Sequence, residues 1–320
     1  MNSERIVDIP TFMLPCNKGP YIWDKSQHLD GIGSTIQWRK PSMFAAHILR
    51  GKWIGNLTNE HHVEEGDQSG YFGLSDLSDC NVNALKMHEK QKTMIFFRTT
   101  EHMFKKYIVE KKHRHQFNKS TVVIFNWEHT WIESNNFAVI DSSVRKRFHQ
   151  KRLLRQTPNR KSNQYWVSIH FRWGDTKTTD PDNPGGRTGL SFKGYCACVH
   201  EILLVNPNVE IYFFAEGFPH PELCEHLKYK NIHFINESIT WKRDIDIMSQ
   251  SQLLIGGSSS FFVLGSHLCE NCTVIHSSDR KFKQTEYEET LPKHLIDTNC
   301  NKTLTCYLEG IKTTKTLLEH

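Results

Sequence analysis

The sequence of 320 residues has no long apolar run, little net charge and no internal repeat. None of its hydrophobic stretches approaches the roughly 18 residues that a membrane-spanning helix requires. Its hydrophobic content is 38% and its mean hydropathy is negative. The net charge of +5 is too weak to indicate a nucleic-acid partner, although it suits an anionic small ligand. We therefore expect a soluble protein with one large or two medium α/β domains.

Cysteine is present without the pattern of a disulfide framework or a zinc ribbon. The chain has nine cysteines, an odd number for a protein of this length. Cys269 and Cys272 form a C-x-x-C motif, but no second such motif stands at zinc-ribbon spacing. We expect a local disulfide or free thiols at this motif, and no metal site.

The N-terminus lacks the apolar stretch of a signal peptide, because Glu4 and Asp8 stand where that stretch would lie. If Met1 is the natural start, the protein is expected in the cytoplasm, with no membrane span in this chain. If an anchor has been removed, the Golgi lumen is the expected location. Sequons are weak evidence for a secretory route; they start at Asn56, Asn118, Asn236, Asn271 and Asn301.

The first half of the chain is irregular at its start and then becomes mixed helix and strand. Residues 1–29 read as an irregular lead-in. Gly31 and Gly33 lie in a glycine-rich turn, residues 31–34, ahead of a helix at 43–49. Such a turn lets backbone N–H groups approach a ligand, and a plain tight turn is the alternative. Further on, we predict strands at residues 93–97 and 121–125 and, between them, a basic helix at residues 101–115.

Residues 144–161 form a basic cluster. Nucleic-acid binding is one interpretation. The other, which we favour because no aromatic stacking platform is interleaved, is a helix that packs through Phe148, Leu153 and Leu154 with its charges solvated. Pro158 ends this helix and marks the best domain boundary. The cluster consists of Arg145, Lys146, Arg147, Lys151, Arg152, Arg155, Arg160 and Lys161.

After this boundary the pattern alternates between strand and helix. Such an order predicts a parallel sheet with helices on both faces, and hence an α/β fold. The predicted strands are residues 166–171, 210–215, 232–235, 253–255 and 273–276. The predicted helices are residues 191–205, 221–229, 244–252 and 259–268.

The strand at 166–171 ends in charged residues and a polar loop. His170, Arg172 and Asp175 stand where an open α/β sheet binds ligands, beyond the carboxyl end of a strand. These residue types suit an anionic ligand. The alternative is a core histidine beside a surface Arg–Asp pair.

A second candidate for anion binding is the turn Gly256-Gly257-Ser258-Ser259-Ser260, between a strand and a helix. Glycines allow close backbone approach, serine hydroxyls can cap the helix, and the helix dipole favours an anion. The planar guanidinium of Arg172 would complement it by holding two phosphate oxygens. No G-K-[ST] follows, so this is no Walker loop, and a plain helix cap is the alternative.

Taken together, these motifs resemble the metal-independent fucosyltransferases. The resemblance rests on H-x-R-x-x-D after a strand, on D-I-x-x-x-S-Q-x-x-x-L from Asp244 leading into the serine-rich turn, and on the glycine motif at 31–34. It spans roughly residues 30–268 and is greatest for the α1,6 and nodulation-type enzymes. The α1,2 and protein O-fucosyltransferases are further relatives. Each motif is loose, but their order and spacing are specific.

The resemblance implies a GT-B-like fold, in which two Rossmann-like domains face a central cleft. Residues 1–157 would form the N-terminal α/β domain on the acceptor side, with Gly31 and Gly33 contributing to the donor site. Residues 158–320 would form the domain that binds the nucleotide sugar, with GDP-fucose as the donor. No cofactor and no metal are implied, and the partners are this donor and a glycan acceptor.

The resemblance also assigns residues. Arg172 matches the arginine on the donor diphosphate, and His170 and Asp244 match residues that read the guanine. Ser259 and Ser260 match the turn at the phosphates, and Ser258 is a further donor-binding candidate in the same turn. Asp180 occupies the position of the proposed catalytic base of the α1,6 branch, which has Glu there.

Three positions depart from the pattern of the relatives. Trp173 replaces a second arginine, Phe261 replaces a polar residue, and Asp180 is shorter than Glu. Asp175 is the second candidate for the base, with a structural role as its alternative. Asp244 and Asp246 imitate a metal-binding D-x-D motif, but in a helix residues i and i+2 do not share a face.

We therefore expect an inverting transfer by direct displacement, in which Arg172 and residues 258–260 stabilise the leaving diphosphate without a metal. Lys177 would support the base or the phosphate, unless it is an ordinary loop lysine. The alternatives are the same fold with another nucleotide sugar, as in a xylosyl- or rhamnosyltransferase, and a nucleotide- or carbohydrate-binding protein without catalysis.

Overall fold

The structure is a computed structural model of the chain. The chain divides into two compact units, Met1–Arg155 and Gln156–His320, and we describe each unit by itself. The roles expected for the two halves, acceptor side and donor side, stay predictions. The structure describes residues 20–24, 32–55, 57, 68–74, 95–99, 121–125, 138–155, 159–161, 164–173, 192–217, 229–235, 240–257, 259–270 and 272–276.

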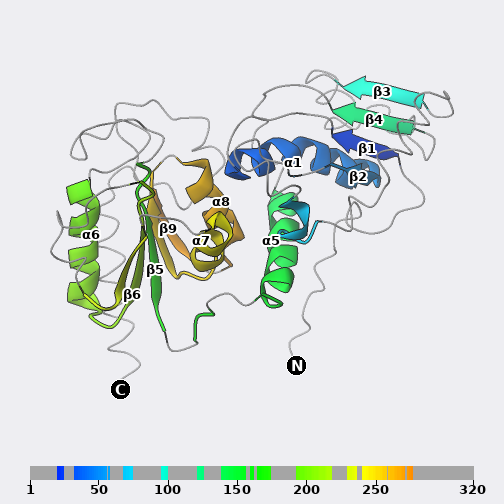
Figure 1. Ribbon diagram of the computed structural model, residues 1–320. Helices are drawn as coiled ribbons and strands as arrows, with labels where there is room; N and C mark the ends of the chain where they lie inside the picture. Colours follow the sequence, from blue (N-terminus) through cyan, green and yellow to red (C-terminus); the bar gives the residue numbers. More distant parts are fainter. Residues whose placement is uncertain are drawn as a thin grey trace. The chain divides into compact units, whose positions relative to one another are not determined.

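Unit 1 contains a parallel sheet in the order β2-β1-β4-β3. Its strands are β1 (Tyr21–Asp24), β2 (Lys52–Ile54), β3 (Ile95–Thr99) and β4 (Thr121–Phe125). Helix α1 (Ile32–Leu49) connects β1 to β2 and packs against both strands. Helix α5 (Ala138–Arg152) packs against α1 (Figure 1). A single 3-10 turn, Gln68–Gly70, is also described.

The start of unit 1 differs from the prediction. β1 lies inside the expected irregular lead-in at 1–29, and β2 was not predicted. α1 begins at Ile32 instead of residue 43 and takes Gly33 into its first turn, so the turn predicted at Gly33 is wrong. Pro41 lies inside this helix, where a proline removes one backbone hydrogen bond and disguises the helical pattern.

Buried polar contacts anchor α1 on both sides of Pro41. The guanidinium of Arg39 pairs with the carboxylate of Asp24 at the end of β1, and both side chains are almost fully buried. The Ser42 hydroxyl donates to Asp24 Oδ2 at 2.5 Å and accepts from the Trp53 indole N–H at 2.8 Å. Because buried charges need partners, this network ties α1 to β1 and β2.

A second buried ion pair joins α1 to α5. The Lys40 ammonium lies 2.6 Å from Asp141 Oδ1, with only 5% of the lysine side chain exposed. Burial lowers the pKa of Lys40, while the charge of Asp141 and its hydrogen bond oppose that shift. Arg39 and Lys40 therefore direct adjacent cations to different neighbours, the sheet and α5.

Helix α5 starts earlier and ends earlier than the predicted basic helix at 144–161. Phe148 is fully buried, as predicted. Leu153 and Leu154 follow the last helical residue in a turn and are 69% and 80% exposed, so their predicted packing is wrong. The helical spacing that would have turned these two leucines toward the core stops at Arg152.

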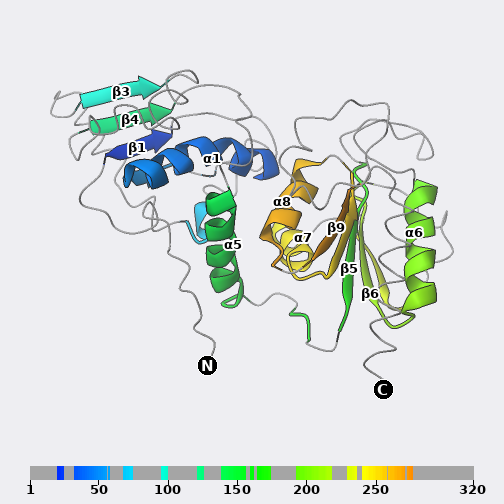
Figure 2. The ribbon, with the colours of Figure 1, turned by 180° about the vertical axis from the view of Figure 1, so that it is seen from behind.

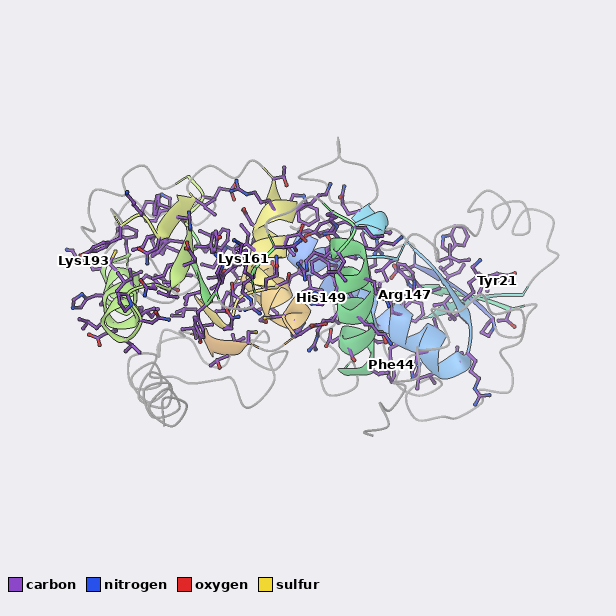
Figure 3. All side chains as sticks on the ribbon, turned by 90° about the horizontal axis from the view of Figure 1, so that it is seen from below. Tyr21, Phe44, Arg147, His149, Lys161 and Lys193 are labelled. Carbon is purple, nitrogen blue, oxygen red and sulfur yellow. The ribbon has the colours of Figure 1, made fainter. Side chains whose placement is uncertain are left out.

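Two arginines of the basic cluster have structural roles. Arg147, labelled in Figure 3, donates from Nη1 to the carbonyl of Gly73 at 3.0 Å. The Arg155 guanidinium lies 3.8 Å from the centre of the Tyr71 ring and donates to the Tyr71 carbonyl. Both cations thus hold the segment 68–74 against α5.

Unit 2 contains a parallel sheet in the order β7-β6-β5-β8-β9. In chain order these strands are third, second, first, fourth and fifth, which is the order of a Rossmann-like sheet. α6 (Phe192–Val205) covers one face, and α7 (Trp241–Met248) and α8 (Ser260–Leu268) lie on the other (Figures 1 and 2). The strands are β5 (Trp166–His170), β6 (Glu210–Phe214), β7 (Ile232–Ile235), β8 (Leu253–Gly256) and β9 (Thr273–His276).

The predicted α/β class with parallel sheets is confirmed. β5 is buried on both faces, because Trp166, Val167, Ser168 and Ile169 are all inaccessible. The main core of unit 2 lies between the sheet and α6, and its members include Val167, Ile169, Ile211, Phe213, Ile255, Tyr195, Val199 and Ile202.

The helices of unit 2 follow the prediction with one shift. α7 begins at Trp241 instead of Asp244 and ends at Met248 instead of residue 252. Thr240 caps its start by accepting from the Arg243 N–H. The predicted helices at 101–115 and 221–229 fall outside the described residues, apart from Tyr229. No described helix is long and apolar enough to cross a membrane.

The Arg39–Asp24 pair gives a first prediction. Arg39→Met leaves a buried carboxylate without its cation, and we expect a loss of about 3–5 kcal/mol in the free energy of unfolding, measured with urea. Lys146→Ala, at an exposed position of α5, is the control and should change it by less than about 0.5 kcal/mol. The double variant Asp24→Leu, Arg39→Met should recover part of the loss. A loss below about 1 kcal/mol for Arg39→Met would contradict the role of the pair.

Candidate functional site

The candidate site lies at the carboxyl edge of the unit 2 sheet, where the strand order reverses. From β5 the chain builds β6 and β7 on one side, and then returns to place β8 and β9 on the other. Open α/β sheets bind ligands at such a switch point. It lies between the carboxyl ends of β5 and β8, which are His170 and Gly256.

The strand register brings the two predicted motifs together. His170 pairs with Gly256 across β5 and β8. The backbone stays in the sheet for one more residue, since the Phe171 N–H donates to the Phe214 carbonyl at 2.8 Å. Ser259, the N-cap of α8, lies only three residues beyond Gly256, and the helix begins at Ser260. Residues more than eighty positions apart in the chain thus meet at one edge.

Side chains beyond β5 alternate between the two faces of the sheet. Phe171 and Trp173 turn to the α6 side, where their rings stack at 5.7 Å and 25°. His170 turns to the α8 side, with its ring 5.8 Å from Phe261. The same alternation predicts that the half-buried Arg172 faces the side of His170 and of the start of α8.

This alternation explains Trp173. Besides stacking on Phe171, its ring packs against the hydrophobic core under α6. Phe171 in turn contacts Phe192 and Tyr195 of that helix. A residue at this position faces away from the α8 side. Trp173 therefore has a packing role at the position where the sequence resemblance leads us to expect a second arginine.

The start of α8 supplies donors for an anion. The helix begins at Ser260, the first N–H groups of an α-helix have no acceptor in the preceding turn, and the dipole adds positive potential there. Ser259 is the N-cap and is 3% exposed, but its hydroxyl makes no capping hydrogen bond. The predicted capping by this serine hydroxyl is therefore wrong.

Gly256 permits the close approach of α8 to the strand end. A Cβ atom at this position would lie 2.5 Å from Cδ2 of Phe262, well inside van der Waals contact. The Phe262 ring also lies 6.3 Å from the ring of His170. Phe261 and Phe262 thus form an aromatic wall beside His170. The sequence pattern did not reveal this wall, although two adjacent aromatics after the serines were its signal.

Asp244 lies in the first turn of α7 and is 7% exposed. α7 leads into β8 and contacts β5 and α8. A helix between parallel strands runs against them, so its first turn lies toward the carboxyl edge of the sheet. Asp246 is fully buried in the same helix. Among the described residues, no group of three or more His, Cys, Asp or Glu is arranged to hold a metal ion.

Cys269 and Cys272 of the C-x-x-C motif form no disulfide. The Cys269 thiol donates to the Ser251 carbonyl at 3.1 Å.

Other predicted site residues belong to unit 1 or lie outside the described residues. Gly33 lies in α1 of unit 1, and its relation to the site in unit 2 is not described. The predicted residues that fall outside are Gly31, Asp175, Lys177, Asp180 and Ser258.

No family model and no curated protein matches the chain. Among solved structures it is similar to a Listeria monocytogenes protein described as a UDP-N-acetylglucosamine 2-epimerase. The identity is 10% and the TM-score 0.40, over 92% of this chain and 89% of that one. For an α,α-trehalose-phosphate synthase (UDP-forming) from Burkholderia vietnamiensis, the identity is 11% and the TM-score 0.24, over 57% and 44%.

An aspartate transcarbamoylase from Trypanosoma cruzi has 13% identity and a TM-score of 0.20, over 81% of this chain and 72% of that one. All three likenesses are distant. We therefore infer the function from the chain's own residues.

The contact between Gly256 and Phe262 gives a second prediction. Gly256→Ala forces the ring and the start of α8 to shift, and we expect a loss of about 1–3 kcal/mol in the free energy of unfolding. Gly70→Ala is the matched control, because nothing lies within 4 Å of the added Cβ. Adding Phe262→Leu to Gly256→Ala should restore part of the loss. If both glycine variants unfold alike, the contact does not constrain the turn.

Proposed function

We propose that the chain is an inverting, metal-independent glycosyltransferase with a GT-B-like fold, which moves fucose from GDP-fucose to a glycan hydroxyl. The observation that carries this proposal is the pairing of His170 with Gly256 at the switch point. It joins a strand end that bears Arg172 to a helix start that bears serines. Both features suit the diphosphate of a nucleotide sugar.

The leaving group is the first chemical requirement. As the bond from the anomeric carbon to the diphosphate oxygen breaks, negative charge grows on the nucleoside diphosphate. Arg172 offers two parallel N–H donors to it, and the start of α8 offers backbone N–H groups with Ser259 and Ser260. With Trp173 packed against the core, Arg172 is the cation that this motif contributes to the leaving group.

The acceptor hydroxyl is the second requirement. Its oxygen attacks the anomeric carbon from the face opposite the diphosphate, so the configuration inverts. Asp180 accepts the hydroxyl proton as this bond forms, with Asp175 as the second candidate and Lys177 as support. Asp180 rests on its position ten residues after His170 in the motif.

We assign recognition of the guanine ring of the donor to His170 and Asp244. His170 ends β5 at the switch point, and Asp244 lies in the first turn of α7, a helix that contacts β5. The buried carboxylate of Asp244 suits the paired N–H donors of guanine. The ring of Phe261 lies beside His170 and adds an apolar surface where the relatives have a polar residue.

Nucleotide choice separates this proposal from its alternatives. Calorimetry should detect GDP binding and at least about tenfold weaker UDP binding, a difference of about 1.4 kcal/mol. Tighter UDP binding would favour a transferase that uses another nucleotide sugar. Binding without hydrolysis of any nucleotide sugar would favour a non-catalytic binding protein, and no binding at all would refute the assignment.

Arg172→Ala gives a third prediction. Loss of the guanidinium should lower the rate of transfer or donor hydrolysis by about a hundredfold or more and weaken GDP binding. Arg172→Lys should recover only part of this, since an ammonium cannot bind two oxygens in parallel. Lys230→Ala, an exposed cation in the same unit, is the control and should leave turnover unchanged. If Arg172→Ala kept full turnover, Arg172 would not stabilise the leaving diphosphate.

Asp180→Asn gives a fourth prediction. The amide keeps the size of the side chain but accepts no proton, so GDP binding should persist while transfer falls by about a hundredfold or more. The measurement is the rate of transfer beside the calorimetric affinity for GDP. Asp175→Asn is the comparison: if it loses transfer and Asp180→Asn does not, the base is Asp175.

A further inference from the structure

Two adjacent leucines are exposed where α5 ends. Leu153 and Leu154 are 69% and 80% exposed. Leu204 of α6, at 64%, is a third exposed leucine, but exposed His200 and Glu201 precede it in the same helix. Single exposed leucines are ordinary on protein surfaces, whereas an apolar pair among like charges is not.

The backbone holds the two leucines outward. Hydrogen bonds continue past the helix end: the N–H groups of Leu153, Leu154 and Arg155 donate to the carbonyls of His149, Lys151 and Arg152 at 3.1, 3.0 and 2.9 Å. The next side chain, Arg155, lies over the Tyr71 and Phe148 rings. The contacts of Arg155 therefore fix the end of the turn that follows α5. Leu153 and Leu154 are already held in an exposed position, so binding would not have to order this turn.

The segment of unit 1 that carries the pair is strongly basic. From Ser142 to Arg155 the chain has six Lys or Arg residues and no Asp or Glu. The exposed positions of α5 follow at helical spacing, and Lys146 is among them. We call the following residues the α5 surface: Ser142, Lys146, Gln150, Lys151, Arg152, Leu153 and Leu154.

We propose that the α5 surface docks reversibly on a membrane that carries anionic lipids. The two leucines enter the boundary between headgroups and acyl chains, and the flanking cations stay at the level of the headgroups. Surface helices bind membranes through this combination of apolar area and positive charge. The proposal does not depend on the proposed catalytic function.

A membrane fits this surface better than a nucleic acid does. Leucine side chains cannot stack on bases as aromatic rings do. The guanidinium groups of Arg147 and Arg155, which would suit phosphates, already bond to the carbonyls of Gly73 and Tyr71. Lys146 and Lys151 lie on the same helix, which ends just before the exposed leucines, and a lipid phase would bury those apolar side chains while it attracts the cations.

Co-sedimentation with vesicles tests the proposal. The full chain should bind vesicles with about one third phosphatidylserine at least about tenfold more strongly than pure phosphatidylcholine vesicles at low salt. Leu153→Ser with Leu154→Ser should lower binding to the anionic vesicles by about tenfold or more, because the buried apolar area is lost. Lys146→Gln with Lys151→Gln should lower it by a similar factor and flatten its salt dependence.

Leu204→Ser is the matched control, since it removes an exposed leucine from the other unit. It should leave vesicle binding unchanged, and thermal unfolding should show that all variants remain folded. Equal binding of neutral and anionic vesicles, or unchanged binding of the double leucine variant, would overturn the proposal. So would tight binding of a single-stranded oligonucleotide that the leucine changes do not affect, which would point to a nucleic-acid partner.

Discussion

The candidate site depends on one missing side chain. Gly256 ends β8 opposite His170, and the ring of Phe262 occupies the space where a Cβ atom would lie. This contact determines how closely α8 approaches the strand end. The first N–H groups of the helix, Ser259 before them and the ring of His170 are arranged around it. A glycine here acts through the packing it permits, and its backbone conformation is ordinary.

The sequence predicts the sheet of unit 2 better than that of unit 1, for a physical reason. Strands that are buried on both faces, such as β5, are nearly continuous apolar runs in the sequence, and such runs are easy to recognise. β1 and β2 are only four and three residues long, and their burial comes from the strands and helix beside them. The predicted helix at 43–49 was too short because Pro41 interrupts the helical pattern of α1. The ion pairs of Arg39 and Lys40 with residues distant in the sequence support the part of α1 that was missed.

The same distinction applies to the site. Local patterns place His170 and Gly256 at strand ends, but their adjacency is a property of the sheet register, which no local pattern encodes. The roles of Trp173 and Ser259 were misjudged or left open for the same reason. Which face a residue beyond a strand takes, and whether a serine caps its helix, depends on contacts with α6 and α8.

The basic cluster on α5 shows how one composition can serve two purposes. Arg147 and Arg155 turn inward to bind backbone carbonyls, and this use of charge anchors the turn that exposes Leu153 and Leu154. From the sequence alone, all the cations of the cluster would be assigned to one basic surface. The contacts distinguish the cations that bind backbone carbonyls from Lys146, which lies at an exposed position of α5. Because the α5 surface belongs to unit 1 and the switch point to unit 2, membrane attachment and donor binding would rest on separate residues and could be varied independently.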